Sequence, residues 1–89
     1  MVIAEISVVV AGRVSQSEYV SRVIKLIEKS CLRYQLTPMC TILEAENVEE
    51  ILDVVRKIHE ELFKDESVPR ILTTLKIDDR RDKKDQNGG

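Results

Sequence analysis

The chain has 89 residues, of which 43% are hydrophobic and 34% charged, and this indicates one small folded domain with a modest core. Its formal net charge is -2 and aromatic residues make up 3%, so it lacks the basic excess and the rings of nucleic-acid-binding domains. No apolar run is long enough to span a bilayer, and the N-terminus does not resemble a signal peptide. We therefore expect a cytoplasmic protein that binds neither nucleic acid nor membranes.

The first predicted elements are a strand and a helix. Residues 2–11 (VIAEISVVVA) are rich in β-branched side chains and alternate between a fully apolar face and a mixed face with Glu5 and Ser7. In the stretch that follows, Ser15 and Glu18 have the spacing of a capping box, and apolar residues recur at helical intervals. This pattern predicts an amphipathic helix over residues 15–30.

The stretch LRYQLTPMCTILEAE predicts a hairpin. Apolar and polar residues alternate on both sides of Pro38, which indicates strands at about 32–37 and 40–46. A hairpin that turns near Pro38 puts Cys40 across from about residue 36 and Cys31 across from about residue 45. This offset of about five residues of ~3.3 Å each is too far for a disulfide. We expect the two cysteines to be small packing residues, and no zinc site is expected.

The second predicted helix begins at Asn47, a favourable N-cap residue that is followed three places later by Glu50. The apolar residues that recur at helical spacing predict its buried stripe: Ile51, Leu52, Val55, Ile58, Leu62 and Phe63.

The last predicted element is a strand over residues 68–77, with Pro69 at its entrance. The twelve residues that follow, DDRRDKKDQNGG, contain no apolar side chain. We therefore expect residues 1–77 to form the domain and residues 78–89 to be a charged, largely solvated tail.

The order β-α-β-β-α-β predicts an α+β, ferredoxin-like fold, in which two helices cover one face of a four-stranded antiparallel sheet. Its other face is then left open, with a mixture of apolar and polar side chains that is typical of an interface with a polar recess. The residues expected on that face are Glu5, Ser7, Val9, Gln35, Thr37, Cys40, Ile42, Glu44, Leu72, Thr74 and Lys76.

The sequence offers little for catalysis. His59, the single histidine, lies near the predicted buried stripe of the second helix, where a partly buried structural residue is the ordinary case. Glu5 and Glu44 are a conceivable acid/base pair, but Lys76 on the neighbouring strand indicates charge balancing instead. The pair Arg80–Arg81 lies among aspartates, as is usual in a solvated tail. We expect no enzyme activity, no metal and no cofactor.

Two interpretations of the polar recess remain open. Glu5, Glu44, Thr74 and Lys76 can hold a small polar heterocycle, because carboxylates accept paired hydrogen bonds and a hydroxyl both donates and accepts. Alternatively, they form a polar network between subunits of a structural or regulatory oligomer that has no ligand. A third hypothesis is a redox-responsive protein that uses Cys40.

Four segments in order, VIAEISV, LRYQLTPMCT, IHEELF and TTLKIDDRRDK, resemble the thiamine-binding-protein-like family of small cytosolic proteins. The resemblance covers residues 2–83. It implies a ferredoxin-like protomer, homodimers that pair into tetramers, and binding of thiamine or its hydroxymethylpyrimidine moiety without catalysis. With strand parity, it gives the expected ligand-binding residues: Glu5, Ser7, Gln35, Thr37, Glu44, Thr74 and Lys76.

The chain departs from this family at two positions. Relatives usually have glycine where Cys31 and Cys40 stand here. Because glycine after a helix commonly takes a positive φ, we expect strain or different capping at Cys31. The side chain of Cys40 is expected to lie beside the recess and to narrow it.

Overall fold

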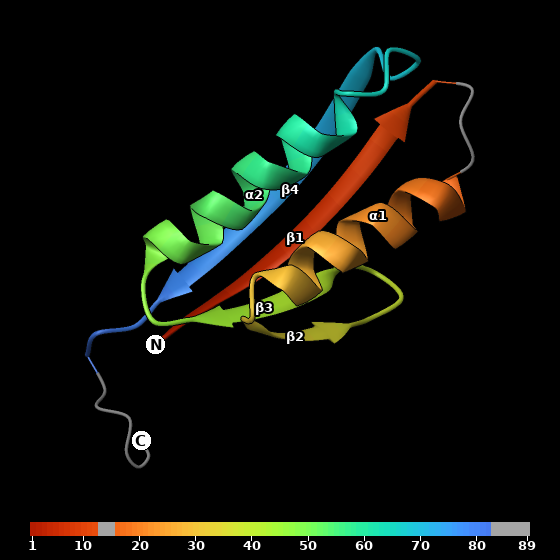
Figure 1. Cartoon of the computed structure of the whole chain (residues 1–89). Helices are drawn as coiled ribbons and strands as arrows, with labels where there is room; N and C mark the ends of the chain where they lie inside the picture. The colour runs from red at the N-terminus through yellow and green to blue at the C-terminus, as the bar shows by residue number, and fades with distance from the viewer. Residues whose placement is uncertain (13–15, 83–89) are drawn as a thin grey trace.

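The structure is a computed structural model that describes residues 1–12 and 16–82 of the chain. It confirms the predicted ferredoxin-like α+β fold. Its elements are β1 (Val2–Ala11), α1 (Gln16–Lys29), β2 (Arg33–Leu36), β3 (Thr41–Ala45), α2 (Val48–Leu62) and β4 (Arg70–Asp79). Figure 1 shows both helices on the same side of the sheet. Among the described residues, no helix has the length and hydrophobicity to cross a membrane.

The sheet has the strand order β2-β3-β1-β4, and all three pairings are antiparallel. β1 pairs with β4 along its whole length, from Val2 opposite Asp79 to Ala11 opposite Arg70. On its other side, β1 pairs with β3 only from Val2 to Ile6. The sheet is therefore long on the β1–β4 side and short on the side of the β2–β3 hairpin.

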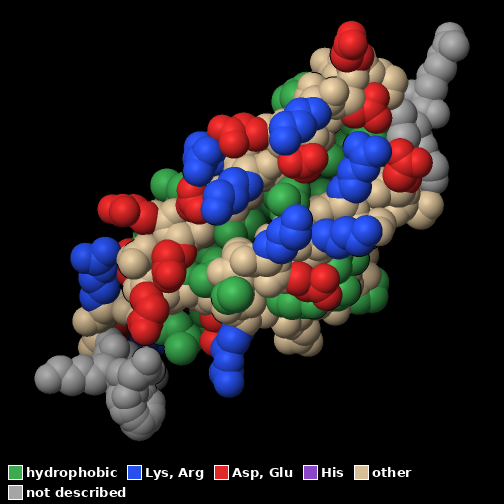
Figure 2. All heavy atoms as spheres, in the orientation of Figure 1, with side chains coloured by type: hydrophobic (Ala, Val, Ile, Leu, Met, Phe, Trp, Pro, Cys, Tyr) green, Lys and Arg blue, Asp and Glu red, His purple; other side chains and the backbone are tan. Residues whose placement is uncertain are grey.

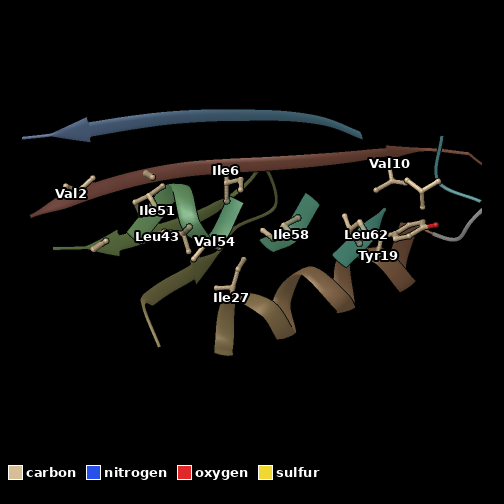
Figure 3. Packing of buried hydrophobic residues seen from close by; sticks show 13 residues of the cluster. Val2, Ile6, Val10, Tyr19, Ile27, Leu43, Ile51, Val54, Ile58 and Leu62 are labelled. Atoms are coloured by element: carbon tan, nitrogen blue, oxygen red, sulfur yellow. The ribbon is translucent and has the colours of Figure 1, made fainter. Parts of the chain in front are cut away.

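The core lies between the sheet and the two helices, as Figure 3 shows. Alternate residues of β1 point into it because successive side chains of a strand face opposite ways. Val2 and Ile6 are only 1% and 3% exposed, and Ile27 of α1 and Ile58 of α2 are fully buried in the same core. The predicted apolar face of the first strand is confirmed.

The predicted buried stripe of the second helix is partly wrong. Ile51, Ile58 and Leu62 are buried, but Leu52 and Phe63 are 48% and 47% exposed. Val54, which the prediction left out, is 3% exposed. The helix has more apolar residues than the sheet beneath it covers, so periodicity alone could not select the buried subset.

The turns around the helices follow local chemistry. The Asn47 side chain accepts a hydrogen bond from the Glu50 amide at 3.0 Å, which confirms the predicted N-cap, and Glu50 Oε1 accepts from the Glu46 amide at 2.9 Å. After α1, Cys31 has a φ of 64°, a left-handed conformation that is strained for a residue other than glycine, in agreement with the strain expected at this position. Ser15, the predicted cap of the first helix, lies outside the described residues.

Two predicted boundaries need correction. β4 continues to Asp79 instead of ending at residue 77, because β1 begins at Val2 and the antiparallel register brings Asp78 and Asp79 beside it. In the hairpin, Leu36 lies opposite Thr41, so Cys40 follows the strand pairing across from Thr37 and not from residue 36. The Thr37 amide donates to the Cys40 carbonyl at 2.9 Å and closes this turn.

The outer surface of the helices is charged. Figure 2 shows acidic and basic side chains along both helices, with hydrophobic side chains visible between them. On α2, Arg56 Nη1 lies 2.9 Å from Glu60 Oε2, and Lys57 Nζ lies 3.1 Å from Asp53 Oδ2. Hydrogen bonds from Arg56 and Lys57 hold the pKa of the Asp53 carboxyl below its usual value. This helical layer is therefore the solvated side of the molecule.

Candidate functional site

The candidate site is the sheet face turned away from the helices, on the far side of Figure 1. We call it the open face. The strand register aligns its residues in rows across the sheet: Arg33, Glu44, Ile3 and Asp78 in one row, Gln35, Ile42, Glu5 and Lys76 in the next, and Ser7 and Thr74 in a third. Six of the seven predicted ligand residues thus share this face, and Thr37 does not lie on a strand.

Glu5, Ser7, Thr74 and Lys76 line a hollow of about 300 Å³ together with Ile6, Met39 and Cys40. We call it the Glu5 hollow. Glu5 and Lys76 are directly opposed on β1 and β4, and Lys76 Nζ lies 3.9 Å from Glu5 Oε1. Both side chains are more than half exposed, so this ion pair restrains the carboxylate only weakly. The hollow therefore combines an accessible carboxylate with hydroxyl groups and an apolar wall.

The Cys40 side chain lies at the edge of the Glu5 hollow, as predicted. Its Sγ is 3.5 Å from Glu5 Oε2 and 3.7 Å from Thr37 Oγ1. Both cysteines are free thiols, Cys40 partly buried and Cys31 exposed. The interpretation of Cys31 as a packing residue is therefore wrong.

A second hollow of about 360 Å³, the Glu44 hollow, lies beside β2. Its polar lining includes Gln35 and Glu44 from the predicted set, and Arg33, which stands directly opposite Glu44. Arg33 was not among the residues predicted for this face. Its alternation with Gln35 is the signal that could have placed it there, but its pairing with Glu44 needs the hairpin register, which the prediction had one residue off.

Thr37 differs from the other predicted ligand residues because its hydroxyl is used inside the turn. Its Oγ1 donates to the Cys40 carbonyl at 2.8 Å and accepts from the amides of Cys40 and Met39 at 3.0 and 3.2 Å. A hydroxyl with these partners holds the hairpin in shape and positions Cys40 and Met39, which line the Glu5 hollow. The sequence signal for this role is a threonine before proline in a tight connection.

A larger hollow of about 430 Å³ lies between α1 and the hairpin turn, beside the part of β1 that follows Ile6 and no longer pairs with β3. Its described walls are mostly apolar and include Val8, Val20 and Leu36, and no described lining residue is charged. This lining offers no charged group that would neutralise a cation, so we do not place the site there.

The remaining candidates for chemistry have structural partners. His59 Nε2 lies 2.7 Å from Thr73 Oγ1, which links α2 to β4 on the covered side of the sheet. Arg81 Nη2 pairs with Asp79 at 2.9 Å, and hydrogen bonding to Arg81 lowers the pKa of the Asp79 carboxyl. Within residues 1–12 and 16–82, no group of three His, Cys, Asp or Glu side chains could hold a metal ion.

This geometry defines the class of the protein. It is a ferredoxin-like domain whose antiparallel sheet has one face covered by helices and one hollowed face with polar side chains. The sequence profile of the family described as thiamine-binding protein matches residues 4–88. The chain belongs to this family.

Relatives agree with this assignment. A UPF0045 protein of Methanothermobacter thermautotrophicus is 40% identical over 84 residues, which cover 92% of this chain and 84% of the relative. The UPF0045 protein YqgV of Bacillus subtilis is 39% identical over 90 residues, covering 94% and 85% of the two chains.

Solved structures share the fold. A hypothetical protein from Methanocaldococcus jannaschii, MJ1052, has a TM-score of 0.82 at 36% identity and covers 93% of this chain and 84% of its own. A Thermotoga maritima protein, TM0486, named as a candidate thiamine biosynthesis/salvage protein, has a TM-score of 0.73 at 30% identity, with 89% and 83% covered.

Proposed function

We propose that this protein is a homo-oligomer that binds thiamine or its hydroxymethylpyrimidine moiety in the Glu5 hollow, without catalysing a reaction on it. The observation that carries the proposal is the grouping of Glu5, Ser7, Thr74 and Lys76 in one hollow of about 300 Å³. The family description and the name of the Thermotoga maritima neighbour support the choice of ligand.

The chemistry of the hollow suits an aminopyrimidine. The Glu5 carboxylate would accept from the exocyclic amine or a protonated ring nitrogen. The hydroxyl groups of Ser7 and Thr74 would complete the hydrogen bonding, because each can donate and accept. Carbon and sulfur atoms of Met39 and Cys40 would cover a ring face.

A second subunit would close the hollow. Apolar side chains around it are strongly exposed in the single chain: Ile3 is 43%, Val9 52% and Leu72 56% exposed. An exposed apolar patch with a polar centre is typical of a surface that another molecule covers. The bound ligand would then lie between subunits, where its hydrogen bonds are shielded from water.

One observation favours the alternative, a structural or regulatory homo-oligomer with no small-molecule ligand. The Glu5–Lys76 ion pair at 3.9 Å balances the charge of the hollow by itself. Such a pair can serve as a polar contact in an interface whose hollow stays empty.

Calorimetry with thiamine and with hydroxymethylpyrimidine tests the proposal. Losing one partner of a buried charged hydrogen bond typically costs ~2–5 kcal/mol, so Glu5→Gln should weaken binding at least ~30-fold while the oligomer stays intact. Glu49→Gln, on the exposed first turn of α2, is the matched control and should leave binding unchanged.

Glu44→Gln separates the two hollows. A loss with Glu44→Gln and none with Glu5→Gln would move the ligand to the Glu44 hollow. If neither compound releases heat or raises the melting temperature at millimolar concentration, the binding proposal fails and the structural alternative replaces it.

A further inference from the structure

The hollow of about 430 Å³ between α1 and the hairpin turn, which we call the α1 hollow, lies beside an uncovered part of β1. β3 begins at Thr41, which stands opposite Ile6, whereas β1 continues to Ala11. In Figure 1, β1 runs on past the hairpin turn. Within the described chain, the last part of β1 is therefore a strand edge, although β1 is an inner strand of the sheet.

The hydrogen bonds of the hairpin show which way the backbone groups of β3 and β1 point. The Thr37 amide donates to the Cys40 carbonyl at 2.9 Å, so Cys40 turns its carbonyl toward the β2 side. Backbone groups of successive residues in an antiparallel ladder point to opposite sides, so Thr41 turns its groups toward β1. Ile6, the partner of Thr41, therefore turns its own N–H and C=O groups toward β3.

Val8 and Val10 turn their backbone groups the same way as Ile6, because the direction repeats every second residue. The Val10 carbonyl has a partner, since Gln16 Nε2 donates to it at 2.7 Å, and Gln16 lines the α1 hollow. On this side, no described strand stands in register with Val8 or Val10. Val10 is only 4% exposed, and buried backbone groups are nearly always hydrogen-bonded. The Val8 N–H and C=O groups and the Val10 N–H group thus form a row that an occupant of the α1 hollow can bond.

The walls of the α1 hollow fit an apolar side chain. Val20 and Leu36, which are 52% and 50% exposed, line it together with Val23. A residue that pairs with Val8 in an antiparallel ladder carries its side chain on the same face of the sheet as Val8, which is the face toward the helices. None of the described lining residues carries a charge, so a charged side chain there would lose its water without gaining a partner.

We propose that the α1 hollow binds an extended, uncharged peptide segment of a partner protein, which continues the line of β3 beside β1. A strand backbone bonds all three free groups of Val8 and Val10, because its own groups have the same spacing. The uncharged walls match an uncharged segment. These hydrogen bonds do not involve Glu5, so the proposal holds whether or not the Glu5 hollow binds a ligand.

The register of the bound segment follows from the free groups. Its central residue exchanges two hydrogen bonds with Val8 and places an aliphatic side chain against Val20 and Val23. Two residues earlier, a carbonyl of the segment accepts from the Val10 amide. Because Gln16 already holds the Val10 carbonyl, the ladder ends there, and about three residues or ~10 Å of peptide fit beside β1.

Capped pentapeptides and NMR spectroscopy of the full chain test the proposal. The probe is an acetylated and amidated pool with valine or isoleucine at the centre and serine, threonine or alanine elsewhere. At millimolar concentration it should shift the amide resonances of Val8 and Val10. At ten times its dissociation constant it should slow hydrogen exchange of the Val8 amide about tenfold. A pool with aspartate at the centre is the matched control and should change neither.

Two results of this experiment would overturn the proposal. The first is no change at Val8 and Val10 with the aliphatic pool, or equal changes with both pools. The second is a shift of these resonances by hydroxymethylpyrimidine and by neither pool, which would make the α1 hollow a small-molecule site.

Methylation of single peptide nitrogens separates strand pairing from simple apolar contact. A methyl group on the central nitrogen removes the donor to the Val8 carbonyl and should weaken binding at least about tenfold. On the next residue the N–H points away from β1, so methylation there is the control and should be tolerated. Equal binding of the two methylated peptides contradicts pairing with β1.

A charge in the wall tests the position of the segment. Val20→Glu places a carboxylate in the α1 hollow and should abolish binding of the aliphatic pool. Ser21→Glu adds the same charge at the next residue of α1, which is exposed and does not line the hollow, and should leave binding unchanged. Circular dichroism confirms that both variants are folded. Binding to Val20→Glu as tight as to the wild type would place the segment elsewhere.

Discussion

The two faces of β1 both carry apolar side chains but differ in how far the chain covers them. Val2 and Ile6, which point toward the helices, are 1% and 3% exposed, while Ile3 and Val9 on the open face are 43% and 52% exposed. The alternation of a strand supplies apolar residues to both faces, and the two helices can cover only one. The covered face therefore supplies the core that stabilises the folded chain. The exposed apolar side chains of the open face are explained by a molecule that binds there.

Truncating one apolar side chain at the covered face and one at the open face should give the largest difference in unfolding free energy. Ile58→Ala leaves a cavity beneath the covered face, where Ile58 is fully buried, and should cost ~2–5 kcal/mol of unfolding free energy. Leu72→Ala on the open face, where Leu72 is 56% exposed, should cost less than ~0.5 kcal/mol in a dilute monomeric sample.

Urea unfolding of the two variants measures this difference. Similar losses from Ile58→Ala and Leu72→Ala in the monomer would show that the open face contributes to folding of the single chain as much as the core does. A loss for Leu72→Ala that grows with protein concentration would instead locate its contribution in the oligomer.

Acid should destabilise the fold mainly through carboxylates on the helical side of the molecule. This effect should be smaller than the loss of stability expected for Ile58→Ala. Asp65, after α2, accepts hydrogen bonds from the Ser67 hydroxyl at 2.7 Å and the Ser67 amide at 2.9 Å, and these bonds lower the pKa of its carboxyl. Arg22 of α1, whose Nη1 lies 3.8 Å away, acts in the same direction. A lowered folded pKa gives stability that is present above the unfolded value of ~3.9 and is lost as the pH falls below it.

Melting temperatures between pH 6 and pH 3 check this expectation. The wild type should lose stability mainly below about pH 4, and Asp65→Asn should show a shallower loss over the same interval. The neighbouring acidic residue, Glu66, is exposed, so Glu66→Gln is a suitable control that should follow the wild-type curve. If the melting temperature of Asp65→Asn falls with pH as steeply as that of the wild type, the Asp65 carboxyl does not contribute to the loss of stability in acid.

The fold and most of the open face could be predicted from the sequence because both follow from period-two alternation. One parity assignment places Glu5, Ser7, Thr74 and Lys76 on the same face, and the antiparallel register then brings them together. No long-range information is needed beyond the order of the elements.

The errors arise where tertiary context decides. Leu52 and Phe63 fit the apolar period of α2, but the part of the chain that the structure describes leaves them 48% and 47% exposed, because the helix has more apolar residues than its neighbours cover. Thr37 fits the alternation of the second strand, but the strand ends at Leu36 and the threonine hydroxyl bonds to the turn. The pairing of Arg33 with Glu44 required the hairpin register to within one residue.

The most direct test of the account is the labelling rate of its two native thiols with a maleimide, resolved by peptide mass spectrometry. Cys40 lies at the edge of the Glu5 hollow, 3.5 Å from Glu5, whereas Cys31 is exposed and lies outside that hollow. Thiamine or hydroxymethylpyrimidine at ten times its dissociation constant fills about 90% of sites and should slow labelling of Cys40 about tenfold. Cys31 should react at the same rate with and without the compound. Equal labelling of Cys40 in the presence and absence of both compounds at millimolar concentration would contradict a binding site on the open face.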